Sequence, residues 1–321
     1  MVNGGFTMFT SAIRRDSGPA RKAWRVVLAG LLGLAATPLA AAEEQKGWRL
    51  EPDARIEFQT VSAQTTTRDE DLVIDGEALS VRGQVGLGIE SKRTRVRLEA
   101  DRIEVFRLGN GRRDVSRDRL TASVEQDVTD TLELQAQVRR YDDLVTVESP
   151  DTDAWEYSAR ATYEPTRENR FRLWATWRDR QYDNGAAPAT TGDGARFDAQ
   201  YRRRFGASHY LTFDLRTESI RSGDTQRGYE RDSAGVSYTR PVGPDLRVRP
   251  AVEVIKTRFD GRIADDGALR RDRQVVPEVE LQWWPGKWRV EAEAKYVFFK
   301  SNESAREREG YRLTLSVGYV F

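Results

Sequence analysis

Residues 310 to 321 read GYRLTLSVGYVF, with an apolar or aromatic side chain at every second position from Tyr311 to Phe321. Successive side chains of an extended strand point to opposite sides, so one face is apolar and the other carries polar or small groups. In water, an apolar edge strand of this kind invites pairing with other chains. In a transmembrane β-barrel the apolar face meets lipid, and closure of the sheet removes the free edge. The stretch therefore predicts a lipid-facing barrel strand.

The aromatic residues at the end of this stretch add a resemblance. Tyr319 and Phe321 make it similar to the C-terminal strand of Gram-negative outer-membrane barrels, which ends in Phe with an aromatic residue two positions earlier. The resemblance implies a porin-like outer-membrane protein whose last strand is read by the barrel-insertion machinery. The residues to which it assigns this insertion signal are Tyr311, Leu313, Leu315, Tyr319 and Phe321.

The N-terminal segment predicts export. Basic residues at Arg21, Lys22 and Arg25 precede an apolar run over residues 26–36 and then Ala40-Ala41-Ala42. This order is that of a secretory signal peptide with a small-residue cleavage site. A membrane-anchor helix is the alternative, but the apolar run is short and interrupted. We expect residues 1–42 to be removed after Ala42, with Ala40 as a second possible site, and residues 43–321 to form the barrel.

Composition supports strands over helices as the spanning elements. Charged residues make up 32% of the chain and the mean hydropathy is -0.68, whereas barrel strands need apolar groups only at alternate positions. The 52 basic and 51 acidic residues nearly balance, which argues against a nucleic-acid partner. The chain contains no Cys, which excludes thiolate metal sites and thiol nucleophiles.

Segments of about ten alternating residues recur from residue 47 onward, separated alternately by short turns and longer loops. We predict an all-β, transmembrane, antiparallel up-and-down β-barrel of about fourteen strands, within a range of about 12 to 16, with both termini in the periplasm. A phase change near Asp101 suggests a bulge in the third strand. The longest loop, Arg258–Arg273, is the one expected to fold partly inward. A soluble exported β-sandwich is the alternative fold.

The second face of the strands is charged, and such side chains are costly against lipid, so they are expected to line the lumen. In one interpretation they pair across strands and select nothing. In the other, an arginine track guides anionic solutes past an opposed glutamate wall, because Arg suits carboxylates and phosphates. The expected lumen residues are Arg82, Arg95, Arg97, Glu99, Arg139, Arg160, Arg172, Arg178, Arg196, Arg202, Arg216, Arg247, Arg249, Glu278, Glu280, Glu291 and Glu293.

These features favour an outer-membrane channel for passive diffusion of small polar or charged solutes. A barrel for export or surface assembly of polysaccharide or lipoprotein, and a structural or adhesive barrel, are the alternatives. Enzymatic activity is not expected, because the single histidine, His209, falls at a predicted periplasmic turn. No loop has the full ligand spacing of a calcium site, so neither a metal nor a cofactor is expected. The expected partners are outer-membrane lipid, lipopolysaccharide, the barrel-insertion machinery, periplasmic chaperones and the solutes.

Overall fold

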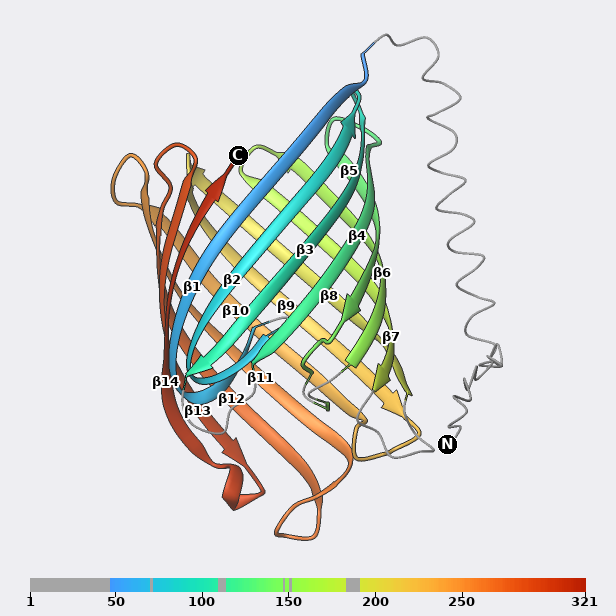
Figure 1. Ribbon diagram of the computed structural model, residues 1–321, viewed down its shortest axis with the longest axis vertical. Coiled ribbons are helices and arrows are strands. Elements are labelled where there is room, and N and C mark those ends of the chain that lie inside the picture. The colour runs from blue at the N-terminus through green and yellow to red at the C-terminus, as the bar shows by residue number, and fades with distance from the viewer. Residues whose placement is uncertain (1–46, 70–71, 109–113, 147, 150–151, 183–190) are drawn as a thin grey trace, which may run out of the picture. The chain divides into compact units, whose positions relative to one another are not determined.

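The chain forms a closed antiparallel β-barrel of fourteen strands, which confirms the predicted fold class and strand number (Figure 1). The computed structural model describes residues 47–69, 72–108, 114–146, 148–149, 152–182 and 191–321. The predicted signal peptide and its cleavage positions lie outside these ranges. The strands are β1 Arg49–Asp69, β2 Leu72–Glu90, β3 Thr94–Leu108, β4 Val115–Asp127, β5 Leu132–Asp142, β6 Thr152–Thr166, β7 Asn169–Tyr182, β8 Thr191–Gly206, β9 His209–Ser222, β10 Tyr229–Pro241, β11 Leu246–Ile263, β12 Leu269–Trp283, β13 Trp288–Ser301 and β14 Arg308–Val320.

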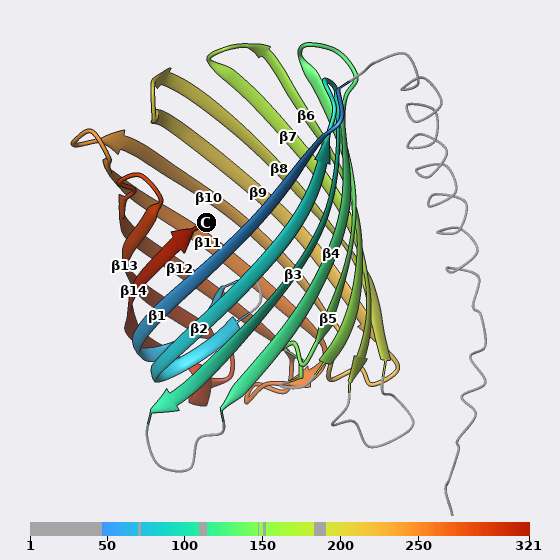
Figure 2. The ribbon, with the colours of Figure 1, turned by 45° about the horizontal axis from the view of Figure 1, so that its top comes forward.

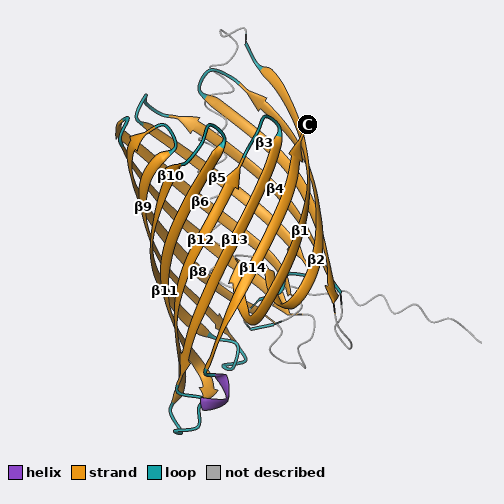
Figure 3. Ribbon diagram, turned by 90° about the vertical axis from the view of Figure 1, so that its left-hand side faces the viewer, coloured by secondary structure: helices purple, strands orange, loops and turns teal. Residues whose placement is uncertain are grey.

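Each strand pairs with its neighbours in sequence, and β14 closes the sheet by pairing with β1 (Figure 3). Phe58 lies opposite Val317, and Ile56 lies opposite Tyr319. The Phe321 N–H donates to the Ala54 carbonyl at 3.0 Å. Closure gives the backbone N–H and C=O groups on the free edges of β1 and β14 hydrogen-bond partners, so these groups are satisfied within the sheet.

The barrel has two different ends (Figure 2). We call the end with connections such as 167–168 and 207–208 the short-turn end, and the end with connections such as 143–151 the long-loop end. Aromatic side chains are exposed on the outer face near the short turns, as expected for an interfacial girdle. Trp288, Tyr319 and Phe321 form an edge-to-face series there, with ring centroids 5.1 and 4.9 Å apart.

The structure corrects two predictions about strand ends, and the first concerns the phase change in β3. In β3, Ile103 and Val105 are buried while Arg102 is exposed, although β3 keeps its register through Asp101. The phase change therefore has no bulge behind it. In β3 the inward positions change from charged at Asp101 to apolar at Ile103 and Val105, while the outward positions change from Leu98 and Ala100 to Arg102 and Glu104. Such a change is expected where a strand extends beyond the lipid into water.

The second correction concerns the predicted long loop Arg258–Arg273. Strands β11 and β12 continue through most of it, and the connection is only residues 264–268. The Ser304 backbone N–H and Oγ–H both donate to Asp265, which lowers the pKa of that carboxyl below its usual 3.8. Donors from Ala268 and Asn302 lower the pKa of Asp266 in the same way. These bonds join the β11–β12 and β13–β14 connections, and the inward fold is made elsewhere, by the described residues 143–146 and 148–149.

Apart from strands, the ranges that the structure describes include a short 3-10 helix, η2 (Ser304–Arg306). Among these residues no helix is long and apolar enough to cross a membrane.

Candidate functional site in the barrel lumen

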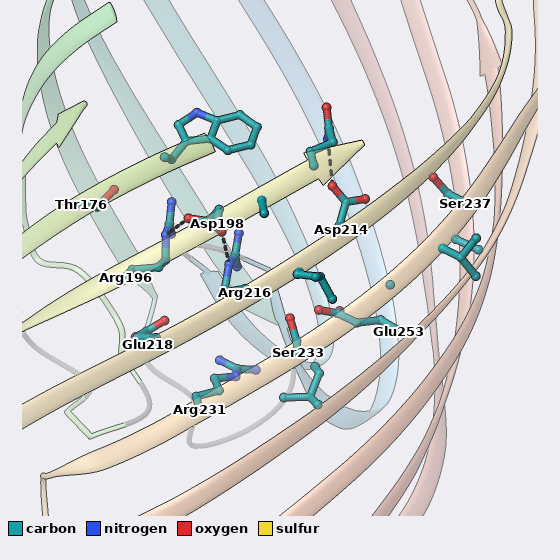
Figure 4. A pocket seen from close by; sticks show the side chains of 18 of the residues that line it. Thr176, Arg196, Asp198, Asp214, Arg216, Glu218, Arg231, Ser233, Ser237 and Glu253 are labelled. Carbon is teal, nitrogen blue, oxygen red and sulfur yellow. Dashed lines mark hydrogen bonds and ion pairs between the residues drawn. The ribbon is translucent and has the colours of Figure 1, made fainter. Parts of the chain in front are cut away.

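A cavity of about 670 Å³ occupies the middle of the lumen. Its wall comes from β5 to β13 and is mostly charged or amide-bearing, because the inward positions of these strands carry those residue types. In the close view of Figure 4, Asp198 lies between two arginines. Its carboxylate accepts from Arg196 Nε at 2.7 Å and from Arg216 Nε at 2.6 Å.

Most lumen charges are neutralised by neighbours of opposite sign. Arg160 contacts Glu125 at 3.1 Å and Glu133 at 2.8 Å. On the opposite wall, Arg249 contacts both Glu278 and Glu280. This pairing follows from register, because directly opposed and diagonal residues of one face lie within side-chain reach. Arg249 lies directly opposite Glu280, whereas Arg160 reaches Glu133 diagonally and Glu125 from two strands away. The wall is therefore polar but largely compensated.

The predicted lumen residues share the inward face of the sheet but fall into different neighbourhoods. One group lines the cavity itself: Arg139, Arg160, Arg178, Arg196, Arg216, Arg249 and Glu278. A second group lies beside β1 and β4, with partners such as Asp53, Asp101 and Glu125: Arg82, Arg95, Arg97 and Glu99. The remainder lie on β7, β8 and β11 to β13, outside the cavity lining: Arg172, Arg202, Arg247, Glu280, Glu291 and Glu293.

A buried cluster adjoins the cavity on its long-loop side. Arg178 lines the cavity and contacts Glu156 and Glu218, each at 2.8 Å. Two residues further along β7, Arg180 pairs with Glu148. The Glu148 side chain is fully buried, and its Oε1 also accepts from Tyr182 Oη at 3.2 Å. An isolated buried charge would be strongly destabilising. These side chains can be buried because each arginine of the cluster contacts at least one glutamate.

Glu148 lies in the β5–β6 connection and reaches this cluster through its contacts with Arg180 and Tyr182 of β7. Asp143 begins this connection with φ 60°, a left-handed conformation that Asp tolerates better than most residues. Leu144 N–H then donates to the Thr152 carbonyl at 2.8 Å, and its side chain packs against Tyr141 and Ala154. The inward segment is therefore held both by hydrogen bonds and by an apolar contact.

A close approach by Tyr182 requires a glycine on the adjacent strand. A Cβ at Gly192 would lie 2.3 Å from Tyr182 Oη, so any larger residue at this position would displace the tyrosine. Gly192 is directly opposite Arg180 in the β7–β8 ladder. The glycine thus leaves the space that the arginine and tyrosine occupy.

Sequence reasoning missed several members of this cluster. Arg180 and Tyr182 continue the inward alternation of β7, so strict extension of that pattern would have found them. Glu148 carries no such signal, because it lies in a connection and its partner is 32 positions away. Buried apolar residues in the same half of the lumen, Ile220, Tyr229 and Phe259, were missed because lumen positions were expected to be polar.

His209 lies at the start of β9, at the short-turn end. Its Nε2 is 2.6 Å from Tyr238 Oη, and its ring packs beside Phe205 with centroids 5.2 Å apart. The histidine thus belongs to the aromatic residues of that end. Across the part of the chain that the structure covers, no three His, Cys, Asp or Glu residues are grouped so as to hold a metal ion.

No protein-family model and no curated protein sequence matches the chain. Solved structures that resemble it include the outer membrane protein OmpT of Vibrio cholerae, at 9% identity and a TM-score of 0.51, covering 87% of this chain and 99% of that one. A loop L8 deletion mutant of the same protein gives 10% identity and a TM-score of 0.52, with 86% and 100% covered. At these identities the likeness concerns the fold. The chain therefore has the closed-barrel fold of bacterial outer-membrane proteins.

Proposed function

We propose that the protein is a channel of the bacterial outer membrane that lets small polar or charged solutes diffuse through its lumen. The observation that carries this proposal is the charged cavity of about 670 Å³ inside a closed barrel with an apolar outer surface. A lumen filled only to hold the barrel together would be packed throughout. In this proposal the short-turn end faces the periplasm, as is usual for such barrels.

The buried cluster around Glu148 narrows the proposed path at the long-loop end. Tyr182 and Tyr229 are each about 1% exposed or less, so water has little access between them. The structure thus favours a low-conductance pore over a wide one. This filled end is also the observation that supports the second candidate, a barrel for export or surface assembly that opens only when its cargo or a partner engages it.

Reconstitution of the purified protein in planar bilayers tests the channel directly. We expect discrete conductance steps, together with swelling of proteoliposomes in isotonic solutions of small sugars or amino acids. A protein that is folded, as judged by altered mobility in unheated detergent gels, but silent in both assays would contradict the channel and favour the assembly role. Solutes larger than the cavity should give no swelling in either case.

A further inference from the structure

Three neighbouring arginines at the short-turn end lack the ion pairs that most lumen charges make. Arg170 and Arg202 lie directly opposite each other in the β7–β8 ladder. Arg172 lies two positions along β7, on the same face. Like charges placed directly opposite each other destabilise a sheet. Elsewhere on the same face, the register opposes Glu156 to Arg178 and Asp198 to Arg216.

No carboxylate lies within ion-pair distance of these three arginines among the residues that the structure describes. The charges of Glu164, Glu133 and Asp214 act on them only from farther away. All three side chains are half-buried, and the Nε–H groups of Arg170 and Arg172 are enclosed without a hydrogen-bond acceptor within the described structure. Three neighbouring cations therefore share one region of the wall, and within the described ranges none of them has a carboxylate at ion-pair distance.

Three contacts orient two of these arginines. The Arg202 guanidinium lies over the Tyr210 ring, 4.2 Å from its centroid, and its Nε donates to Thr212 Oγ1 at 3.3 Å. The Arg170 terminal nitrogen reaches Gln200 at 3.5 Å, and Gln200 lines the central cavity. Stacking fixes the plane of Arg202 and leaves its terminal N–H groups available, so the group is preorganised beside the cavity.

We propose that Arg170, Arg172 and Arg202 form a binding site for the anionic group of a small solute, a carboxylate or a phosphate. Guanidinium groups present planar, forked donors that match the oxygens of both, and such charge-assisted bonds are among the strongest available to a solute. The proposal rests on the channel function for the passage of the solute, and it adds small organic acids and phosphate compounds as the preferred class.

Titration calorimetry on the detergent-solubilised full chain tests the site without relying on conduction. The probes are inorganic phosphate and succinate, titrated at constant ionic strength. Arg172→Gln and Arg202→Gln should each weaken binding roughly tenfold, the effect of losing one charge-assisted interaction. Each change removes one of three like charges, so the variants should still fold. Altered mobility in unheated detergent gels checks that they do.

Arg97→Gln is the matched control. Arg97 is also an inward arginine near the short turns, but it is paired with Asp53 at 2.7 Å and with Glu99 at 3.5 Å. Its loss removes the same lumen charge and should change binding less than twofold. The proposal is overturned if the wild-type protein binds neither probe, or if Arg97→Gln weakens binding as much as Arg202→Gln.

Bilayer recordings on the same preparations separate the two proposals. Binding that depends on Arg202 in a protein without conductance would support the anion site and contradict the channel. Conductance without arginine-dependent binding would support the channel and contradict the anion site. For a channel with the site intact, we expect the reversal potential in a KCl gradient to show anion preference, which Arg202→Gln should reduce.

Discussion

Glu148 is a fully buried acid in the long-loop half of the lumen. It is the acid that the described part of the β5–β6 connection contributes to the buried cluster, and it pairs with Arg180. Removing one partner of a buried pair costs about 3–5 kcal/mol, because the other charge is left buried without compensation. Glu148→Gln should therefore release the inward segment, raise single-channel conductance and expose residues 143–149 to proteases.

The change at Glu148 has a matched control at the start of the next strand, β6. Asp153 pairs with Arg140 at 2.7 Å, but both side chains are more than a quarter exposed to solvent. Because a solvent-exposed ion pair contributes little, Asp153→Asn should have little effect on conductance or cleavage. Glu148→Gln combined with Arg180→Gln removes both buried charges and should restore protease resistance. An unchanged conductance and cleavage pattern in Glu148→Gln would show that the segment is held by other contacts, such as those of Leu144.

Among elements, β14 is where the sequence was most informative. Its alternation predicted a lipid-facing strand, and its outward residues Leu313 and Leu315 are exposed on the barrel surface. Strand existence was predictable because lipid imposes a period-two pattern on every spanning segment. Strand ends were less predictable. In β3 the inward positions become apolar beyond Asp101, so Ile103 and Val105 looked like a shift in the alternation of the strand. The strand in fact continues without a bulge, as expected for a strand that extends beyond the lipid into water.

The insertion signal assigned to β14 stays a prediction, and Phe321 offers its sharpest test. Its ring is exposed, and only its backbone N–H, bonded to Ala54, contributes to closure. Deleting Phe321 should therefore reduce the amount of barrel in the outer membrane while leaving the conductance of each inserted molecule unchanged. Quantitative blots of membrane fractions, paired with single-channel recordings, measure the two separately. An altered unit conductance with normal abundance would place Phe321 in the pore instead.

For the whole molecule, closure and strand number followed from sequence, whereas the contents of the lumen did not. Counting alternating segments and expecting an even number was sufficient for fourteen strands. Which charges compensate one another depends on register, and register brings together residues such as Arg160 and Glu125, 35 positions apart. The same dependence explains why Arg172 and Arg202 could not be separated from the paired arginines by sequence alone.

The two ends of the barrel carry different charge, so the proposed pore is asymmetric along its axis. Uncompensated arginines gather at the short-turn end, while a compensated and tightly packed cluster occupies the long-loop half. Fixed charge at one mouth enriches counter-ions there and not at the other. The proposed pore should therefore rectify weakly: in symmetric salt it should pass more current at one voltage polarity than at the other. High salt should abolish this rectification, because it screens the fixed charge, and Arg202→Gln should diminish it. Equal currents at both polarities in dilute salt would contradict the assignment of charge to a single mouth.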